Sequence, residues 1–557
     1  MTDHQEVEWQ FDANDLSTIE QWLLARPSDS GVTVSPSSTD HLTDTYYDTD
    51  DWRCHRVGFA LRVRQHGDEI EATLKAFKSQ TKIAGLRSRR EITQHLTDHK
   101  DLLSLKELKG AVSDRLRLVT GSYILRPMFD VQTHRKSFDL LLNPPEGLKP
   151  SVRLGEVTLD DTTITVGEKQ AKLTRVEIEI KPNMIKRLQP FVDEMRAECN
   201  LQPATASKFG TGMTLGNYNP TFTLDLGSLI INHESSLGDA AFAVMRKHFI
   251  AFLACEPVAR LGEDSEAIHD MRVATRRLRA AMSLFRSILS TRFERVRDEL
   301  KWIAQTLGDT RDLDVQIAQL NEWTQDRSLI TVLIKEREQS QAKLLEALDS
   351  KRYHQLIRVL TELLKRGAVN RVEAKARAVE TAPPLIAARW KRFSKAADGV
   401  TLESSAEEYH GVRIRVKRLR YAVEFFSDLY GEAAQDLIAR FVVVQDILGA
   451  HQDAHVAMPR LRTLVDKHGK QLTPQTIFAM GEIAQRYAHH ALELRKQFPK
   501  ANKKLDKRWK GLRKEMKKKK ETVETKETKK KRETGKAKEK KEMSVIAHPM
   551  RTEGDSL

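Results

Sequence analysis

The sequence is poor in cysteine and aromatic residues, and it has no long apolar run. Its three cysteines, Cys54, Cys199 and Cys255, are scattered over 557 residues, unlike the closely spaced cysteines of a disulfide framework. Aromatic residues make up 6% of the chain, and no stretch approaches the roughly 20 apolar residues of a membrane helix. The start of the chain, MTDHQEVEWQF, lacks the apolar segment of a signal peptide. We therefore expect folded domains in a reducing cytoplasm and no transmembrane segment.

Positive charge is concentrated near the end of the chain. The formal net charge is +15, yet residues 500–543 hold 21 Lys and Arg against 8 Asp and Glu, whereas residues 1–499 hold 71 against 68. A basic site in the folded part must therefore be a local cluster. The lysine-rich tail is typical of a disordered or transiently helical segment. It could bind nucleic acid, polyphosphate or an anionic membrane surface, or simply aid solubility.

Length and pattern predict two folded domains, because a single core stops growing at roughly 250–300 residues. Residues 4–216 have mainly the pattern of strands, and in residues 234–499 apolar residues recur at helical spacing. Residues 217–233 are predicted to be a linker, and residues 500–557 a low-complexity tail. The expected fold class is α+β: an antiparallel β-barrel with flanking helices, followed by an all-α domain.

Nine strands and two helices are predicted in the first domain, with turn residues such as Asp160-Asp161 between several strands. The helices are Asp15–Ala25 and Ile185–Cys199. The strands are Glu6–Phe11, Thr43–Asp48, Phe59–Gln65, Glu69–Lys75, Arg87–His95, Met128–Leu141, Val152–Leu159, Thr162–Val166 and Leu173–Lys181.

Charged residues alternate along several of these strands, so that they share one face. The rows are Glu6, Glu8 and Gln10; Arg62 and Arg64; Glu71, Thr73 and Lys75; Arg87, Arg89 and Glu91; and Glu177, Glu179 and Lys181. One interpretation is a sheet with its charges in solvent, which is the commoner arrangement for any single strand. The other is a barrel with a polar lumen and a covered outer face. Rows of both signs favour the lumen, because carboxylates bind Mg²⁺ or Mn²⁺ and Arg and Lys bind phosphate oxygens.

The order of these rows resembles that of CYTH domains, also called triphosphate tunnel metalloenzymes. EVEWQ at residues 6–10 is similar to their ExExK opening. Further similar segments follow in order: Tyr47-Asp48-Thr49, ALRVR at 60–64, TLK at 73–75, RSRRE at 87–91, Arg135, the Leu159-Asp160-Asp161 turn, VEIEI at 176–180 and Ser207-Lys208. A lone ExE would be weak evidence, whereas this ordered set over residues 4–213 is specific.

The resemblance implies hydrolysis of a triphosphate inside an eight-stranded tunnel with Mg²⁺ or Mn²⁺. Asp160 is expected either to support the metal or to form a turn, and the side chain of Lys181 is expected to face solvent. The implied metal ligands, which are also the catalytic residues, are Glu6, Glu8, Glu177 and Glu179. The implied phosphate-binding residues are Arg62, Arg64, Lys75, Arg89, Arg135 and Lys208, with Arg87 and Glu91 as second choices.

Gln10 departs from the family pattern, which has a lysine at this position. A lysine gives a full charge to a phosphate, whereas a glutamine gives only a neutral hydrogen bond. The change predicts weaker activity or another preferred substrate, and it leaves open a barrel that binds phosphates without catalysis.

The second domain contains an internal repeat. IHDMRVATRRLRAAMSLF from Ile268 matches YHGVRIRVKRLRYAVEFF from Tyr409, and LGDTRDLDV from Leu307 matches LGAHQDAHV from Leu448. Both pairs are offset by 141 residues. Duplicated helical bundles often place one site between the two copies.

Each copy carries a basic row on one helix face, because its residues recur every three or four positions. The rows are His269, Arg272, Arg276 and Arg279, and His410, Arg413, Lys417 and Arg420; Arg277 and Arg418 lie beside them. Such rows repel unless an anion is present. The alternative is a solvated face paired with Asp312, Asp314 and Asp453. Histidines on basic faces bond phosphate or carboxylate more often than metal.

The duplicated rows resemble the CHAD domain, a histidine-containing α-helical domain often found beside CYTH domains. The resemblance implies a basic channel that binds inorganic polyphosphate. The second copy has Gln452 and His455 where the first has Arg311 and Asp314.

Together, the two resemblances predict a metal-dependent inorganic triphosphatase that also binds polyphosphate. One alternative hypothesis is an enzyme of the same fold that acts on an organic triphosphate, such as thiamine triphosphate or ATP, by hydrolysis or cyclisation. The other alternative hypothesis is a polyphosphate-binding protein with a degraded tunnel. The oligomeric state does not follow from the sequence.

Overall fold

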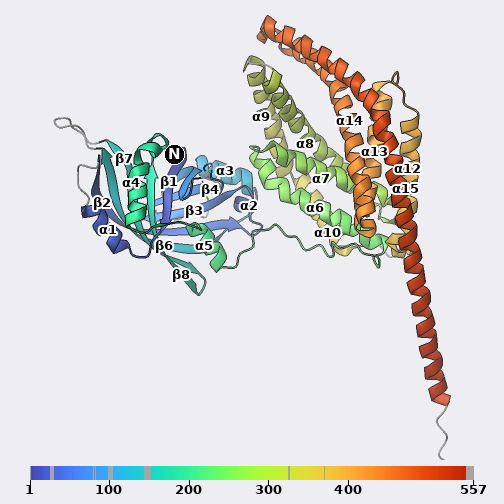
Figure 1. Cartoon of the computed structure of the whole chain (residues 1–557), viewed down its shortest axis with the longest axis horizontal. Coiled ribbons are helices and arrows are strands. Elements are labelled where there is room, and N and C mark those ends of the chain that lie inside the picture. Colours follow the sequence, from blue (N-terminus) through green and yellow to red (C-terminus); the bar gives the residue numbers. More distant parts are fainter. Residues whose placement is uncertain are drawn as a thin grey trace, which may run out of the picture. The chain divides into compact units, whose positions relative to one another are not determined.

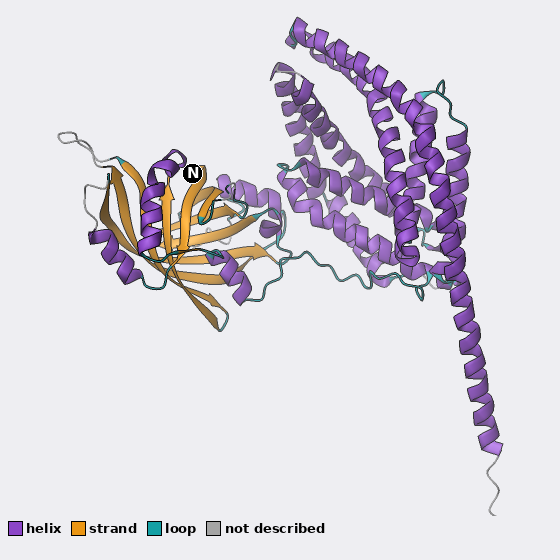
Figure 2. Cartoon of the chain, in the orientation of Figure 1, coloured by secondary structure: helices purple, strands orange, loops and turns teal. Residues whose placement is uncertain are grey.

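A computed structural model describes residues 2–25, 31–79, 81, 83–97, 105–142, 152–323, 327–368 and 371–546. Its contacts divide the chain into two compact units. The first comprises Met1–Leu224 with Ala254–Ala267, and the second comprises Asp225–Leu253 with Ile268–Leu557. Strands occur in the first unit, and the second is helical (Figure 2).

The first unit is an antiparallel barrel of eight strands, because β5 pairs with β1 and closes the sheet. The strand order is β5-β4-β3-β2-β6-β7-β8-β1, and the short strand β9 (Gln202–Pro203) adds to β1. The strands are β1 (Thr2–Asp12), β2 (Val32–Thr49), β3 (Phe59–His66), β4 (Glu69–Ala76), β5 (Leu86–Leu96), β6 (Leu125–Leu142), β7 (Arg153–Val166) and β8 (Lys169–Ile180). Closure leaves no edge among these eight strands.

Apolar side chains cover the outside of the barrel and leave the charged rows inside. Along β1, Val7, Trp9 and Phe11 pack with α1 (Leu16–Ala25) and α4 (Ile185–Glu198). On the other side, strands β3 to β5 pack against α3 (Ala111–Thr120). Because side chains alternate between the two faces of a strand, Glu6 and Glu8 are on the inner face. The prediction of a polar lumen with a covered outer face is confirmed.

One predicted turn in the barrel is wrong. The segments Val152–Leu159 and Thr162–Val166 are not two strands, because β7 runs unbroken from Arg153 to Val166. Asp160 lies opposite Arg135 in the β6–β7 pairing and is fully buried. Its ion pair with Arg135, at 2.6 Å, holds the carboxylate inside the barrel. Two adjacent aspartates therefore continue the strand here, although the pair is a common turn signal.

Three helices of this unit were missed in the sequence: α2 (Arg53–Arg56), α3 and α5 (Lys208–Leu215). α5 matters for the site. The Ser207 hydroxyl accepts a hydrogen bond from the Gly210 N–H at 3.0 Å and caps the helix. The cap fixes Lys208 as the first helical residue.

The helices of the second unit form two groups (Figure 1). One contains α6 (Leu237–Leu261), α7 (Ser265–Leu284), α8 (Arg292–Trp323), α9 (Arg327–Asp349) and α10 (Lys351–Arg366). After the short α11 (Val372–Lys375), the other contains α12 (Ala378–Asp398), α13 (Ala406–Phe425), α14 (Ser427–His468) and α15 (Pro474–Ile546). The repeat places its two basic rows on α7 and α13.

The tail predicted from residue 500 is helical and packed over its first part. α15 continues through this position, and Leu505, Trp509 and Leu512 are buried. Trp509 stacks on Trp390 of α12, with ring centroids 4.6 Å apart. The packing of α15 therefore extends to Met516, which is also buried. The last part of the predicted tail, residues 547–557, lies outside the described residues.

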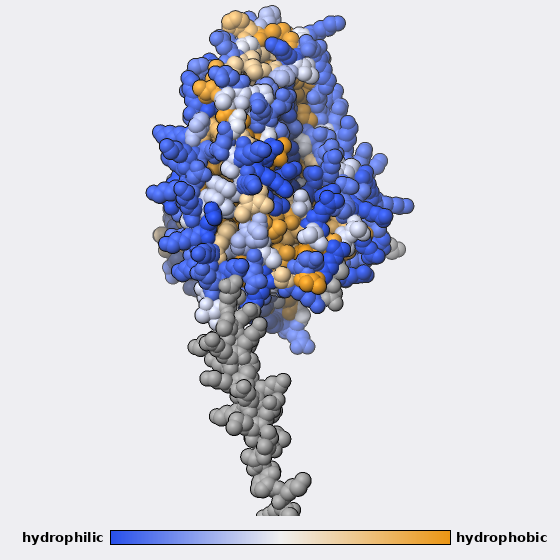
Figure 3. Space-filling model, turned by 90° about the vertical axis from the view of Figure 1, so that its right-hand side faces the viewer, coloured by the Kyte–Doolittle hydropathy of each residue, from blue (hydrophilic) through white to orange (hydrophobic). Residues whose placement is uncertain are grey.

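The surface of the second unit is largely hydrophilic in the view of Figure 3, with apolar patches among the charged side chains. Within the described part of the chain, no helix combines the length and the apolar character that a membrane span requires.

Candidate functional site

The barrel encloses a cavity of about 190 Å³. All ten side chains assigned to the tunnel line it, and they come from six strands and α5: Glu6, Glu8, Arg62, Arg64, Lys75, Arg89, Arg135, Glu177, Glu179 and Lys208. The structure thus brings residues as far apart in the chain as Glu6 and Lys208 into one chamber. Glu91, a second choice, also lines the cavity. Arg87 donates to the Ala204 carbonyl instead, and Lys181 is exposed.

Three carboxylates surround the ammonium of Lys75. Its Nζ lies 2.5 Å from Glu6, 3.2 Å from Glu8 and 3.6 Å from Glu91. Arg89 donates to the same Glu8 oxygen at 2.7 Å. Burial tends to lower the pKa of Lys75, but the three carboxylates outweigh it and hold the pKa above its ordinary value. Lys75 therefore remains charged.

The acidic residues of the cavity differ in their pKa. Burial, together with the charges of Glu8 and Glu91, raises the pKa of Glu6 to about 8. Burial and Glu8 also raise the pKa of Glu179. Burial would raise the pKa of Glu177 as well, but Lys208 and Arg135 outweigh it and keep this carboxyl ionised. Burial thus dominates the pKa of Glu6 and Glu179, whereas neighbouring cations dominate that of Glu177.

Two buried aspartates behind the cavity hold its cations. Asp44 accepts two hydrogen bonds from Arg64, at 2.7 and 2.8 Å. Asp160 accepts two from Arg135 and lies 2.5 Å from the Lys208 Nζ. Such paired bonds fix the plane of a guanidinium. Asp160 therefore orients cations, and Asp44, which the sequence did not single out, does the same.

The donor chemistry of the cavity fits a hard divalent cation. Glu6, Glu8, Glu177 and Glu179 offer carboxylate oxygens, the ligands that Mg²⁺ and Mn²⁺ prefer. In the described part of the chain, however, no three His, Cys, Asp or Glu side chains are grouped closely enough to hold an ion. Lys75 and Arg89 already engage the oxygens of Glu6 and Glu8. Cation binding would therefore require these two basic side chains to shift.

Aromatic side chains form part of the cavity wall. Phe77 follows β4, Phe209 lies in α5, and their rings stack with centroids 5.3 Å apart. His55 lies 4.7 Å from the Phe77 ring, and Phe77 is 36% exposed. No sequence pattern predicts this cluster, because its members come from three separate segments.

The helical unit contains two basic cavities of about 520 and 480 Å³, which share Arg276 and Lys417. The larger contains the predicted Arg279, with Arg418 beside it. The smaller contains three further predicted residues and two aspartates: His269, Arg272, Arg413, Asp312 and Asp453. His410 and Arg420 line neither, since His410 bonds Gln452 and Arg420 pairs with Glu424.

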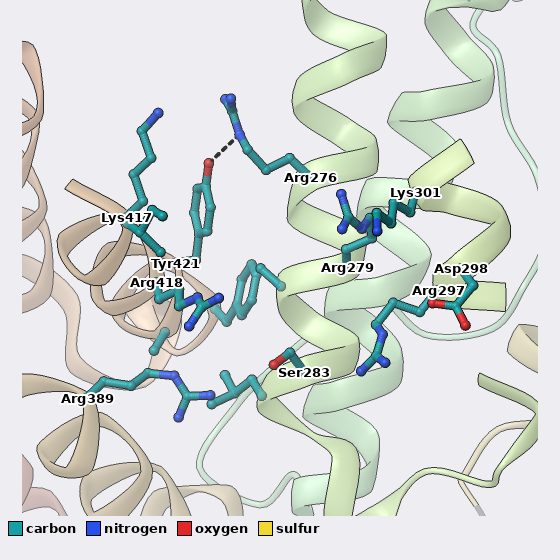
Figure 4. Close-up of a pocket in the computed structure, with 15 residues that line it drawn as sticks. Arg276, Arg279, Ser283, Arg297, Asp298, Lys301, Arg389, Lys417, Arg418 and Tyr421 are labelled. Atoms are coloured by element: carbon teal, nitrogen blue, oxygen red, sulfur yellow. Dashed lines mark hydrogen bonds between the residues drawn. The ribbon is translucent and has the colours of Figure 1, made fainter. Parts of the chain in front are cut away.

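Cations from both helix groups face the larger cavity (Figure 4). Lys417, Arg418 and Arg389 lie on one side, and Arg279, Arg297 and Lys301 lie on the other. Arg276 donates to the Tyr421 hydroxyl at 2.8 Å. Burial and the nearby Arg392 and Arg418 lower the pKa of Arg389 to about 10. The sequence missed Arg297, Lys301 and Arg389 because they lie outside the repeated motif.

Paired acids explain only part of this basic surface. Asp312 lies 3.5 Å from Arg272 and 3.0 Å from Arg460, as the alternative of a paired face predicts. Asp314 pairs with Arg337 instead. Among the described residues, Asp298 is the one acidic residue that lines the larger cavity. This cavity therefore holds a strong excess of positive charge.

Both sequence resemblances are confirmed by family models. The model of the CYTH domain matches residues 4–211, and that of the CHAD domain matches residues 243–462. Two uncharacterized proteins of Mycobacterium tuberculosis are each 28% identical over 261 residues, or 43% of this chain and 48% of theirs. An inorganic triphosphatase of Haemophilus influenzae is 29% identical over 177 residues, or 32% of this chain and 46% of its own. The chain thus spans about half the length of these relatives.

A solved structure, the CHAD domain from the plant Ricinus communis, is also similar. It is 24% identical with a TM-score of 0.44, and the match covers 50% of this chain and 95% of that structure.

Proposed function

Because residues 4–211 form a CYTH domain and residues 243–462 a CHAD domain, we propose that the chain hydrolyses inorganic triphosphate in its barrel and binds polyphosphate in its helical domain. The observation that carries the proposal is the convergence of ten charged side chains on one chamber. The chamber contains cations for a polyanion and carboxylates for a divalent cation.

In the proposed reaction, water attacks a terminal phosphorus of tripolyphosphate. The bond to the bridging oxygen breaks, and phosphate and pyrophosphate leave. Glu6, Glu8, Glu177 and Glu179 would hold Mg²⁺ or Mn²⁺, which when bound polarises the phosphoryl group and activates water.

The basic side chains of the chain supply the rest of the proposed mechanism. Arg62, Arg64 and Arg135 bind phosphate oxygens and stabilise the negative charge that builds up on them. Asp44 and Asp160 fix Arg64 and Arg135 in advance, so less reorientation is needed when the substrate enters.

An organic triphosphate is the second candidate substrate, and the stacked Phe77 and Phe209 favour it. A nucleobase or thiazolium ring could stack on such a wall, which contributes about 1–3 kcal/mol per base in nucleic-acid complexes. Initial rates on tripolyphosphate, ATP and thiamine triphosphate distinguish the candidates.

We expect tripolyphosphate to be the best substrate, and Phe209→Leu to leave its kcat/KM within about twofold. If ATP or thiamine triphosphate is the true substrate, the same variant should lower kcat/KM for that compound about tenfold or more. A preference for an organic triphosphate in the unmodified chain would overturn the inorganic assignment.

Polyphosphate binding by the helical domain should take up a proton at alkaline pH. Burial, with Arg413, Arg276 and Arg420 nearby, lowers the pKa of Lys417 to about 7, so this amine is largely neutral at pH 8 in the free protein. A bound polyanion favours the charged form and raises the pKa. Binding should therefore take up about one proton at pH 8 and weaken as pH rises through 7 and above.

Calorimetry in buffers of different ionisation enthalpy measures this uptake. Lys417→Arg keeps its charge at pH 8, so it should bind polyphosphate with little or no proton uptake. Equal uptake in both proteins would contradict the role of Lys417.

A further inference from the structure

The internal repeat relates the helices of the second unit position by position. α6 begins at Leu237 and α12 begins at Ala378, which is the same offset of 141 residues as in the sequence motifs. α7 spans Ser265–Leu284 and α13 spans Ala406–Phe425, so both ends of these two helices keep that offset. Each residue of the larger basic cavity therefore has an equivalent in the other copy, and the two sets can be compared.

The larger cavity leaves two of its arginines without an acidic partner. Arg279 of α7 and Arg418 of α13 line it, and neither forms an ion pair with any residue that the structure describes. Burial and the nearby Arg297 lower the pKa of Arg279, as expected for a cation whose charge is not compensated. Ser283, also in the lining, is small, uncharged and exposed, and it lies between the cations of the two helix groups (Figure 4). An anion can therefore reach both arginines.

The equivalent face of the other copy carries an acid where the cavity has a serine. The positions that the repeat relates are Arg279 and Arg420, Arg418 and Arg277, and Ser283 and Glu424. Glu424 lies 3.3 Å from Arg277 and 3.1 Å from Arg420. All three side chains are partly buried, so water screens these ion pairs less than it would on an open surface. On this face, which we call the Glu424 face, one carboxylate neutralises both arginines.

Other cations of the cavity have uncharged equivalents around the Glu424 face. Lys301 of α8 corresponds to Val442 of α14, which is apolar although it is 37% exposed. Arg389 of α12 corresponds to His248 of α6. Burial and two nearby cations lower the pKa of His248 to about 3, so its ring is neutral at pH 7. Duplication alone would give two equal basic faces, whereas here only the larger cavity keeps a strong excess of positive charge.

We propose that polyphosphate binds to one of the two faces that the repeat relates, and that Glu424 is a specificity-determining residue that closes the other. The inference rests on the proposed binding of polyphosphate by the helical domain. In the larger cavity an anion has to displace only water from Arg279 and Arg418. On the Glu424 face it has to displace a carboxylate from two arginines, which costs the attraction between these charges.

The first test places the same acid in the larger cavity. Ser283→Glu should lower the affinity of the full chain for long-chain polyphosphate about 10- to 100-fold, because the new carboxylate competes with the polyanion for hydrogen bonds to charged groups. Titration at several salt concentrations measures the effect. The matched control is Gln339→Glu, which adds the same charge at an exposed position of α9 that lines neither basic cavity.

The second test opens the Glu424 face. Glu424→Ser gives this face the residue of the first copy, and Glu424→Gln removes the charge while keeping the size of the side chain. Both variants should bind polyphosphate about tenfold more tightly and with a steeper dependence on salt, because two further arginines can bind phosphate and release counterions. The matched control is Glu407→Ser, which removes an exposed acid from the same helix.

Unchanged affinity in Ser283→Glu would overturn the inference, and so would unchanged affinity and salt slope in both Glu424 variants. Thermal unfolding shows whether each variant is folded, and Glu424→Gln keeps the test valid if Glu424→Ser is not. A full chain that binds no polyphosphate at all would refute the proposed function and this inference together. Binding that is insensitive to the substitutions at both positions would refute only the closed face.

Discussion

Turnover of tripolyphosphate should fall at least about 1,000-fold when Glu6 and Glu177 are both replaced by alanine. The two carboxylates come from β1 and β8, and both line the cavity. Their loss removes two of the four proposed metal ligands. It also leaves Lys75 and Arg135 without one of their partners. Loss of even one preorganised electrostatic group commonly costs about 100- to 1,000-fold in rate.

Steady-state phosphate release measures this effect, and polyphosphate binding by the same protein serves as an internal reference. The helical domain should bind as before, because both substitutions lie in the barrel. The matched control is Glu168→Ala with Glu198→Ala, two exposed acids of the same unit. Unchanged turnover in the Glu6 and Glu177 double variant would rule out the barrel cavity as the active site.

Polyphosphate affinity should fall about 100-fold when Arg276 and Lys417 are both replaced by alanine. These are the residues shared by the two basic cavities of the helical unit. A hydrogen bond to a charged group contributes about 1.5–3 kcal/mol, so losing two such contacts justifies this magnitude. Binding should also depend less steeply on salt, because fewer counterions are released from the polyanion.

Titration with long-chain polyphosphate at several salt concentrations measures both effects. Lys351→Ala with Arg358→Ala is the matched control, since both residues are exposed on α10 and line neither cavity. Removing Arg276 and Lys417 also relieves repulsion among partly buried cations, so the variant should not be less stable. Equal affinity and an equal salt slope would place polyphosphate binding elsewhere, with the lysine-rich part of α15 as the next region to test.

The sequence predicted the chemistry of the barrel better than its turns. The alternation of Glu6 with Glu8 and of Arg62 with Arg64 placed these residues on shared faces, and that alternation depends only on strand geometry. Asp160 was placed in a turn because two adjacent aspartates are a local turn signal. Its pairing with Arg135, 25 residues away, overrides that signal and is visible only in three dimensions.

Residues without a local pattern could not be found from the sequence. Phe77 and Phe209 meet because β4 ends near α5 in space, and neither lies in a recognisable motif. Arg389 reaches the basic cavity from α12, outside the repeated segments. The low complexity of the lysine-rich segment from residue 500 likewise gave no indication that Trp509 packs on Trp390. In each case the contact depends on tertiary packing, which the periodicity of one chain segment does not encode.

The most direct test of the central claim is ³¹P NMR of tripolyphosphate incubated with the purified full chain, with Mg²⁺, with Mn²⁺ or with EDTA. If the barrel hydrolyses tripolyphosphate, phosphate and pyrophosphate should appear in equal amounts from the start of the reaction, and only when a divalent cation is present. Product formation that is equally fast in EDTA, or no products with either cation while long-chain polyphosphate still binds, would contradict it.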